Sequence, residues 1–462
     1  MAKKLWGTRF AKKTNLLTYT FTSSISFDKK LAKYDVLGSI AHARMLGVKK
    51  IIPANDAALI VKGLSSILQD VKSGKFKFDL KAEDVHSNIQ DVLFKKIGPA
   101  ANKLHTARSR NDQIALDVRM YLKEEVKELE HLIKFLQKAI LGFAKNNSKV
   151  IIPGYTHLQT AQCVLFAHHL LAYIEGLERD KARLLDAYKR IDEMPLGSCA
   201  LSGTGLPIER KYVARELEFK DVTQNSIDSV SDRDFIIEVL ADLSILAVHL
   251  SRISEDLILW STREFNFIDI DFSFCTGSSI MPHKKNPDVL ELVRGFVGKI
   301  HGDFSSVLIL MKGLPFSYNR DLQLDKPPLF NSVDTIKNIL TILAELFKNI
   351  NVKEDVIAQR VMDESLFSVD IVEYLIKKGL SYREAHDIVG RLVRDSLDKG
   401  INISSLEPSE LKKYSNKLDS GIKNILNAWA SVNLKTSHGS TNPRLVAKQL
   451  ALWSKRLISR KQ

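Results

Sequence analysis

The chain of 462 residues is long enough for about three domains with a large apolar core, which excludes a small scaffold held by disulfides. Hydrophobic residues make up 45% of the sequence and charged residues 26%, which is the composition of a folded globular protein and excludes a disordered chain. Only 22 glycines and 12 prolines occur. Because their usual combined share is about 12%, a turn-rich all-β protein is disfavoured and a helical fold is expected.

The 68 basic and 54 acidic residues give a formal net charge of +14, which is compatible with nucleic acid, an anionic membrane or an anionic substrate as partner. Most lysines are interspersed with glutamates, as in residues 123–128, a pattern typical of a solvated helix face. The sequence has no arginine-rich tail and no run of about 18 uncharged apolar residues. We therefore expect no nucleic-acid partner and no association with a membrane.

The N-terminal part of the chain is predicted to form a small leading helical domain over residues 1–111. Residues Met1–Arg9 lack the apolar core of a signal peptide, so a cytoplasmic location is expected. Shorter helices follow, such as Asp56–Ser73, which is closed by Gly74. A charged segment at residues 83–86 lies behind them.

Two stretches of a central domain, residues 112–361, are predicted to be unusually long helices. Apolar residues from Leu122 to Phe143 recur at alternating spacings of four and three. Residues 231–262 contain neither glycine nor proline, enough for a helix of about 48 Å, and carry two adjacent apolar stripes. Helices that are apolar on more than one side build bundles, whose covering partners need not all come from one chain. We therefore predict a helical bundle and homo-oligomerisation.

After Asn351 the predicted helices are short again and form a trailing domain over residues 362–462. Ser368–Lys378 and Tyr382–Lys399 are each followed by a glycine in the position where a left-handed residue ends a helix. The predicted fold class is therefore all-α, with three helical domains.

Metal or cofactor chemistry has no support in the sequence. The three cysteines, Cys163, Cys199 and Cys275, show neither paired zinc spacing nor a Cys-x-x-Cys motif, and we interpret them as buried structural thiols. His168 and His169 are adjacent and do not share a helix face, which excludes them as a chelating pair on one helix. No glycine-rich nucleotide loop occurs. We therefore predict no metal and no cofactor.

Four polar segments stand where long helices should begin or end, at residues 105–113, 153–159, 276–287 and 318–323. Each is explained on its own by an ordinary structural role. Ser109 or Ser278 is compatible with a helix N-cap, and His157 with a hydrogen-bonded buried histidine.

Taken together, these segments hold the groups needed to remove a weakly acidic C–H proton beside a carboxylate. Such a reaction needs a base, fixed cationic and amide donors for the carbanion, and an acid for the leaving group. Ser278, Lys284 and Asn286 lie within nine residues of one another. A serine becomes a base where backbone N–H groups, a lysine and the exclusion of water favour its alkoxide, and Gly277 is predicted to allow the close backbone approach. His157 is a candidate proton donor.

At these residues the chain resembles a known family. Gly277-Ser278-Ser279-Ile280-Met281-Pro282, followed by Lys284 and Asn286-Pro287, resembles the signature loop of the fumarase/aspartase superfamily. The argininosuccinate lyase branch of that superfamily is resembled by residues 108–113, 156–162, 221–226, 231–235 and 318–323. The similarity runs from Leu5-Trp6-Gly7 into the trailing domain.

The resemblance implies a three-domain helical subunit whose central helices form a twenty-helix core in a homotetramer, with each active site shared between three subunits. It implies a cofactor-free lyase that eliminates fumarate from argininosuccinate and releases arginine, a step of arginine biosynthesis. A cluster of cationic and amide donors suits this substrate because it carries three carboxylates.

Residue by residue, the resemblance implies that Ser278 is the base and that His157 is the acid, oriented by Glu291. It implies that Lys284 and Asn286 hold the carboxylate on which charge accumulates. The remaining contacts to substrate are implied for Ser24, Arg110, Asn111, Thr156, Tyr318, Gln323 and Lys326.

Some positions depart from the family pattern, and rival functions remain. His283, Gln90 and Leu324 replace residues usual in the family, and Cys163, Ala167 and Cys199 stand where proline or glycine is usual. The rivals are a sister enzyme such as fumarase, aspartase or adenylosuccinate lyase, and a non-catalytic crystallin-like homologue. The segments at 108–113 and 318–326 favour the argininosuccinate branch, and the intact Ser278, His157, Lys284 and Asn286 favour an enzyme.

Overall fold

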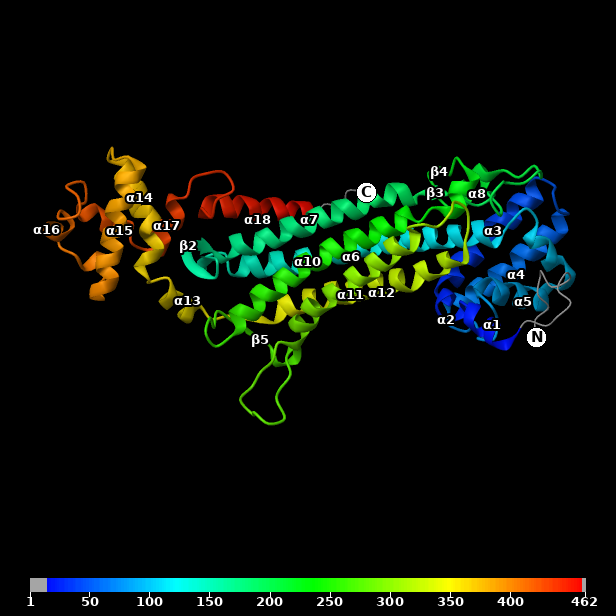
Figure 1. Cartoon of the computed structure of the whole chain (residues 1–462), viewed down its shortest axis with the longest axis horizontal. Coiled ribbons are helices and arrows are strands. Elements are labelled where there is room, and N and C mark those ends of the chain that lie inside the picture. Colours follow the sequence, from blue (N-terminus) through cyan, green and yellow to red (C-terminus); the bar gives the residue numbers. More distant parts are fainter. Residues whose placement is uncertain (1–14, 459–462) are drawn as a thin grey trace. The chain divides into compact units, whose positions relative to one another are not determined.

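Five long helices carry the fold, as the apolar periodicity predicts (Figure 1). They are α6 (Arg110–Asn146), α7 (Phe166–Ile191), α10 (Asp234–Ser261), α11 (Asp288–Met311) and α12 (Lys326–Leu346). The predicted stripe from Leu122 to Phe143 lies within α6, and its central residues Leu129, Ile133 and Leu136 are fully buried. The breaker-free stretch at 231–262 is the helix α10, within one to three residues at each end. The expected bundle-forming helices are therefore confirmed.

The structure is a computed structural model that describes residues 15–458. The sequence features at Met1–Arg9, including Leu5-Trp6-Gly7, lie outside the described residues. The chain divides into two compact units, and all five long helices contribute residues to both. Unit 1 comprises residues 1–131, 180–246 and 297–337, and unit 2 comprises residues 132–179, 247–296 and 338–462.

Unit 1 contains the leading helices and one short sheet. Its elements besides the long helices are α1 (Leu16–Thr22), α2 (Ile25–Asp28), η2 (Lys29–Leu31), α3 (Ala32–Val48), α4 (Ala54–Lys72), α5 (Val85–Ile97), η3 (Gly98–His105), β3 (Glu193–Met194), α8 (Arg210–Glu216), β4 (Asp221–Val222), α9 (Ser226–Ser231) and η5 (Arg320–Asp325). Strands β3 and β4 are parallel. Helices α3, α4 and α5 share a core of buried aliphatic side chains that includes Val36, Ile60 and Leu93.

Buried charges join the long helices within unit 1. Arg233 at the start of α10 donates to Asp325 at 2.5 Å, and both side chains are almost completely inaccessible. Arg119 of α6 donates to Asp232 at 2.5 Å, and its guanidinium lies 4.2 Å from the ring centroid of Phe235. Because a buried charge is costly unless it is paired, these contacts fix the helices against one another.

Unit 2 holds two antiparallel strand pairs and the trailing helices. The hairpin β1 (Ile151–Thr156) and β2 (Gln159–Leu165) and the pair β5 (Ile268–Ile270) and β6 (Ile350–Val352) are followed along the chain by a series of short helices. Its remaining elements are η4 (Phe272–Phe274), η6 (Phe347–Asn349), α13 (Glu354–Arg360), η7 (Glu364–Phe367), α14 (Ser368–Lys377), α15 (Tyr382–Lys399), η8 (Ile403–Ser405), α16 (Pro408–Leu411), η9 (Ser420–Asn424), α17 (Ala428–Leu434) and α18 (Pro443–Ile458).

The ends of α15 show why the predicted bounds of this helix are right. Ser381 and Glu384 form a reciprocal capping box at its start, which satisfies amide groups that the helix leaves without partners. Gly400 follows its last residue with a φ of +62°, a left-handed conformation that glycine adopts without steric cost.

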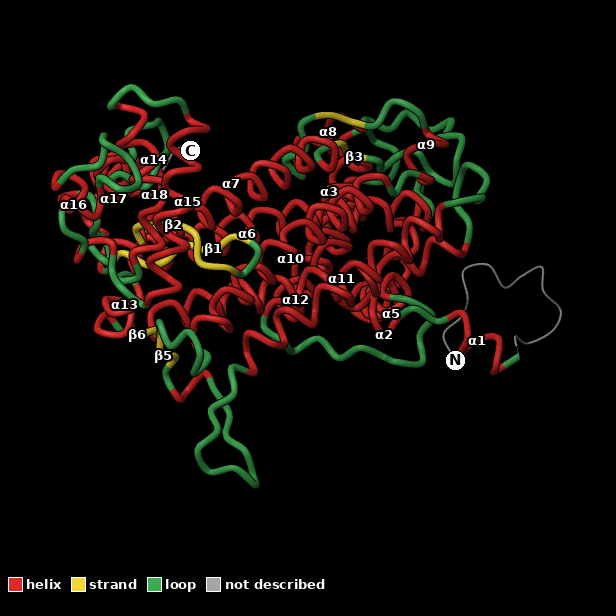
Figure 2. Tube along the Cα trace, turned by 60° about the vertical axis from the view of Figure 1, so that its left-hand side comes forward, coloured by secondary structure: helices red, strands yellow, loops and turns green. Residues whose placement is uncertain are grey.

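The expected all-α class is confirmed, because residues 15–458 are predominantly helical and their three two-stranded sheets, drawn as short yellow segments in Figure 2, are small. The interpretation of all three cysteines as buried thiols needs correction. Of the cysteines, only Cys163 is buried, whereas Cys199 and Cys275 are partly exposed. Among residues 15–458, no helix is both long enough and apolar enough to cross a bilayer.

Candidate active site

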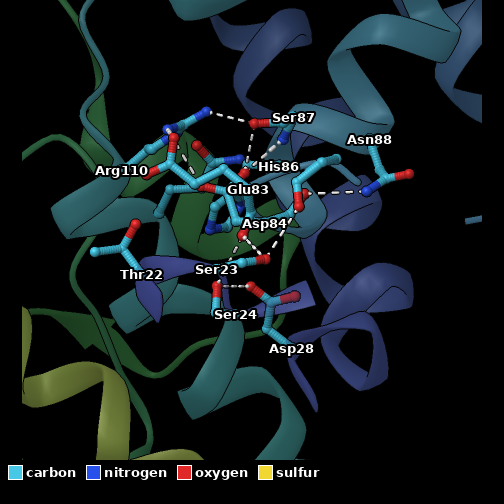
Figure 3. A network of polar contacts seen from close by, with 12 residues as sticks. Thr22, Ser23, Ser24, Asp28, Glu83, Asp84, His86, Ser87, Asn88 and Arg110 are labelled. Atoms are coloured by element: carbon cyan, nitrogen blue, oxygen red, sulfur yellow. Dashed lines mark hydrogen bonds and ion pairs between the residues drawn. The ribbon is translucent and has the colours of Figure 1, made fainter. Parts of the chain in front are cut away.

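The first group of predicted site residues surrounds Arg110, at the start of α6 (Figure 3). Asp84 is the N-cap of α5, and its Oδ1 accepts hydrogen bonds from the amide and the hydroxyl of Ser87 at 2.8 and 2.7 Å. Arg110 Nη1 lies 3.2 Å from Asp84 Oδ2, and Arg110 Nη2 donates to Ser87 Oγ at 2.8 Å. The guanidinium is thus held by the first turn of α5 and remains partly exposed. It is suited to bind an anion from solvent.

Asn111, the neighbour of Arg110, is held by a different contact. Its Nδ2 donates to the carbonyl of Ala200 at 3.0 Å. The loop that carries Ala200 is fixed by Asp112, whose Oδ2 accepts from the amides of Gly197 and Cys199 at 2.9 and 2.8 Å. Burial raises the pKa of Asp112 to about 6, although these amide donors oppose the shift.

Ser24 belongs to a strap, residues 22–24, that lies against the loop before α5 (Figure 3). The Ser24 amide donates to the carbonyl of Glu83 at 2.8 Å, and its hydroxyl donates to Asp28 at 2.5 Å. The carbonyl of Thr22 accepts hydrogen bonds from Arg320 at 2.5 Å and from Gln323 at 3.4 Å. The strap therefore joins two predicted substrate ligands that are about 300 residues apart, Ser24 and Gln323.

Lys326 and Tyr318 complete the predicted ligands of unit 1. Lys326 is buried and donates to Asp325 Oδ1 at 2.6 Å and to the carbonyl of Leu322 at 3.1 Å. Burial lowers the pKa of Lys326 and raises the pKa of Tyr318. The carboxylate of Asp325 is shared with Arg233, so Lys326 lies in a network rich in positive charge.

Thr156 and His157 lie at the tip of the hairpin of unit 2. Thr156 pairs with Gln159, so the two residues between them, His157 and Leu158, form the whole turn. Both have a left-handed backbone, with φ of +54° and +57°. A two-residue turn of this kind favours asparagine and glycine, and other residues are strained in it. The hairpin thus presents an exposed imidazole on a strained, short turn, an arrangement that occurs often at functional sites.

The loop that carries Ser278 projects from a closed stem between β5 and α11 (Figure 2). Thr276 and Asn286 exchange backbone hydrogen bonds of 3.0 and 2.8 Å, and the Thr276 hydroxyl donates to Asp288. Lys285 donates to Asp269 at 3.1 Å, and its ammonium lies 4.1 Å from the ring centroid of Phe272. These contacts fix the stem and leave the tip exposed.

Ser278 is held at the tip by its own backbone. Its Oγ accepts hydrogen bonds from the amides of Ile280 at 3.3 Å and Met281 at 3.1 Å. Two N–H donors directed at one oxygen stabilise negative charge on it, which is what a serine base requires. Asn286 Nδ2 lies 3.4 Å from the carbonyl of Gly277. Within the described residues of one chain no close approach occurs at Gly277, because a Cβ placed there would meet nothing within 4 Å.

The structure gathers the predicted residues into separate groups. Unit 1 holds Ser24, Arg110, Asn111, Tyr318, Gln323 and Lys326, and unit 2 holds Thr156, His157, Ser278, Lys284, Asn286 and Glu291. Within the described part of unit 2, the side chains of His157 and Glu291 are exposed and make no hydrogen bond or ion pair, so the predicted orientation of His157 by Glu291 is not formed within one chain.

One buried cluster of titratable side chains was not predicted from the sequence. Asp35 of α3, His86 of α5 and Asp117 of α6 are buried together in unit 1, with one ligand atom from each within 4.8 Å of the others. Burial by itself would lower the pKa of His86, but the carboxylate of Asp35, 3.0 Å from its Nδ1, raises that pKa to about 9. The only sequence signal was the charged segment at 83–86, because Asp35 and Asp117 stand in ordinary helical patterns.

Comparison with known proteins finds relatives over nearly the whole chain. Residues 8–302 match the sequence model of a family described as lyase, and residues 366–433 match the argininosuccinate lyase C-terminal family. The chain is 49% identical over 448 residues to the argininosuccinate lyase of Geotalea daltonii, covering 97% of this chain and 98% of the relative. It is 47% identical over 450 residues to the argininosuccinate lyase of Syntrophotalea carbinolica, with the same coverage.

Solved structures share the fold. An EDDS lyase in complex with formate superposes with a TM-score of 0.84 and 25% sequence identity, covering 96% of this chain and 90% of that one. A fumarate lyase from Mesorhizobium has a TM-score of 0.72 at 18% identity, covering 94% and 96% of the two chains.

The strained turn yields a first prediction. Leu158→Gly should raise the free energy of unfolding by about 1 kcal/mol, because glycine adopts the left-handed conformation without the cost of roughly 1–2 kcal/mol borne by other residues. Leu158 is 68% exposed, so little packing is lost. Urea denaturation at one protein concentration measures the change. The matched control Gln159→Gly, at the next position, which is also exposed and lies in a strand, should lower stability, and an equal loss in both variants would contradict strain at Leu158.

The buried imidazole yields a second prediction, in the pH dependence of stability. Because the pKa of His86 rises from 6.5 in the unfolded chain to about 9 in the folded chain, its stabilising effect is complete below pH 6.5 and is lost as the pH rises through 9. The stability difference between the wild type and His86→Gln should therefore shrink from pH 6.5 to 9. Denaturation curves at several pH values measure it, and a difference that is constant over this range would contradict a charged His86.

Proposed function

The chain belongs to the argininosuccinate lyase family, and we propose that it catalyses the cofactor-free elimination of fumarate from argininosuccinate with Ser278 as base and His157 as acid. Arginine is the second product, which places the enzyme in arginine biosynthesis.

The geometry of Ser278 is the observation that carries this proposal. As an alkoxide held by the amides of Ile280 and Met281, Ser278 takes the C–H proton beside a carboxylate and becomes a hydroxyl again. Lys284 and Asn286, from the same loop, bind that carboxylate and stabilise the carbanion. The C–N bond then breaks, and His157 gives its proton to the departing guanidine nitrogen.

The donors of unit 1 suit the rest of the substrate. Arg110, Lys326 and the amides of Asn111 and Gln323 offer positive charge and hydrogen bonds to carboxylates. Ser24, Thr156 and Tyr318 add hydroxyl groups. The number of cationic, amide and hydroxyl donors suits a substrate that carries three carboxylates.

We further propose that the subunit has three domains, at residues 1–111, 112–361 and 362–462, and assembles as a homotetramer around a twenty-helix core. Exposed apolar side chains on the long helices support this, among them Leu292 and Ile309 of α11 at 62% and 67% exposure. Three subunits would contribute to each site, with Glu291 orienting His157 of another subunit. The location expected from the N-terminal sequence is cytoplasmic.

Release of fumarate tests the activity and the base together. Purified protein incubated with argininosuccinate should raise the fumarate absorbance and release equimolar arginine. Ser278→Ala should lower kcat by roughly 10²- to 10⁴-fold, the range for loss of a general base, with an unchanged circular dichroism spectrum. Ser279→Ala, in the same exposed loop, is the matched control and should keep its turnover within about twofold.

Three outcomes would contradict parts of this proposal. More than half of the wild-type turnover in Ser278→Ala removes this residue from the mechanism. Absence of both products from the wild type refutes the activity. Fumarate release from adenylosuccinate or aspartate, but not from argininosuccinate, would assign the sister activity instead.

Mixed assembly tests the shared site. Arg110→Ala and Ser278→Ala, each inactive alone, should regain about a quarter of wild-type activity when they are denatured and refolded together in equal amounts. A site is intact only where the subunit that supplies Arg110 carries the Ser278→Ala change and the subunit that supplies Ser278 carries the Arg110→Ala change. Random mixing gives this combination in about one site in four. Each variant refolded alone is the control. No recovery in confirmed mixed tetramers would contradict the shared site and leave the chemistry untouched.

A further inference from the structure

The first turn of α5, which contacts Arg110, is fixed by a buried contact between His86 and Asp35. His86, in that turn, directs Nδ1 at Asp35 Oδ1 across 3.0 Å, and the two side chains are 8% and 1% exposed. Gln113 of α6 donates to the same oxygen. Asp35 Oδ1 of α3 therefore contacts both α5 and α6. His86, its partner on α5, belongs to the same turn as Asp84 and Ser87, which orient the Arg110 guanidinium.

Asp117 has the same neighbours but none of the hydrogen bonds. It lies 3.8 Å from His86 Nδ1, it is completely buried, and both of its oxygens lack a hydrogen-bond partner among the described residues. An ionised carboxylate in such a place would be very costly, so Asp117 is stable there as the neutral acid. Burial and the charge of Asp35 accordingly raise the pKa of Asp117 well above its ordinary value.

A metal ion is a poor explanation for this cluster. The distance from His86 Nδ1 to Asp35 Oδ1 is that of a hydrogen bond, which needs a proton where a metal would need the nitrogen lone pair. The guanidinium of Arg108 is also buried beside both carboxylates and donates to Ser39 at 2.8 Å. The cluster already holds two cations, the imidazolium of His86 and the guanidinium of Arg108, beside the single charge of Asp35, so a further cation is disfavoured.

We propose that Asp35, acting through His86, is the positioning residue of Arg110, and that Asp117 takes no part in this positioning. The charge of Asp35 holds the imidazolium of His86, this fixes the first turn of α5, and the turn sets Asp84 and Ser87 against the guanidinium. The proposal rests on the proposed function in one respect, namely that Arg110 binds a carboxylate of the substrate.

Two isosteric substitutions at equally buried acids separate this role from general structure. Asp35→Asn should lower kcat/KM for argininosuccinate by about tenfold or more, mainly through KM, because it displaces a binding group. Asp117→Asn removes no charge and no hydrogen bond, so kcat/KM should stay within about twofold. Equal losses in the two variants would overturn the proposal.

A double-mutant cycle asks whether Asp35 acts through Arg110. In an Arg110→Lys background, whose lysine cannot form the same paired hydrogen bonds, Asp35→Asn should add little to the increase in KM. An additive increase would show that Asp35 serves another part of the enzyme. Circular dichroism and the oligomeric state of every variant are checked first, and His86→Gln, which should raise KM as Asp35→Asn does, replaces Asp35→Asn if that variant does not fold.

The proposal is separable from the proposed function. If the wild type does not cleave argininosuccinate, the function fails, and the pair is then tested by unfolding alone. The stability losses of Asp35→Asn and His86→Gln should overlap strongly in the double variant, whereas those of Asp117→Asn and His86→Gln should add. Additive losses for Asp35 and His86 would overturn the pairing whatever the enzyme does.

Discussion

A carboxylate that is taken out of water must be compensated by opposite charge or by hydrogen bonds, and unit 1 is organised around this requirement at Asp35. The side chain receives His86 from α5 and Gln113 from α6 while it belongs to α3. A shift of α3 or α5 would leave a charge unpaired, and loss of one partner from such a pair costs about 3–5 kcal/mol. A shift of α6 would remove the hydrogen bond that Gln113 donates to Asp35. The polar groups at the start of α6 and α5 inherit their positions from this buried contact.

The same requirement applies to another buried carboxylate of unit 1, that of Asp325. Asp325 receives Arg233 at 2.5 Å and Lys326 at 2.6 Å, so a single carboxylate compensates two cations. The balance is positive, which leaves attraction for an anionic substrate. In a chain with a net charge of +14, this local surplus is more informative than the total, because exposed ion pairs such as Lys30–Asp334 and Lys189–Asp186 contribute little.

Local signals in the sequence predicted the helices well. The stripe from Leu122 to Phe143 predicted the buried side of α6, and the residues around α15 predicted its two ends. The hairpin β1–β2 was missed because Pro153 and Gly154 disfavour a strand, and its turn uses histidine and leucine where a turn signal would be asparagine and glycine. Of the candidate site, the segments were predictable, but the link between Asp35 and His86 was not. These residues are 51 positions apart, and only packing brings them together.

The closed stem of the Ser278 loop has a mechanical consequence. Thr276 and Asn286 each donate a backbone hydrogen bond to the other across the stem. The nine residues between them are therefore expected to move as one loop relative to β5 and α11. Any movement of this loop carries Ser278, the proposed base, together with Lys284, a proposed carboxylate ligand. The two proposed functions are therefore coupled through the stem, and a substrate that draws in one of them also brings the other closer.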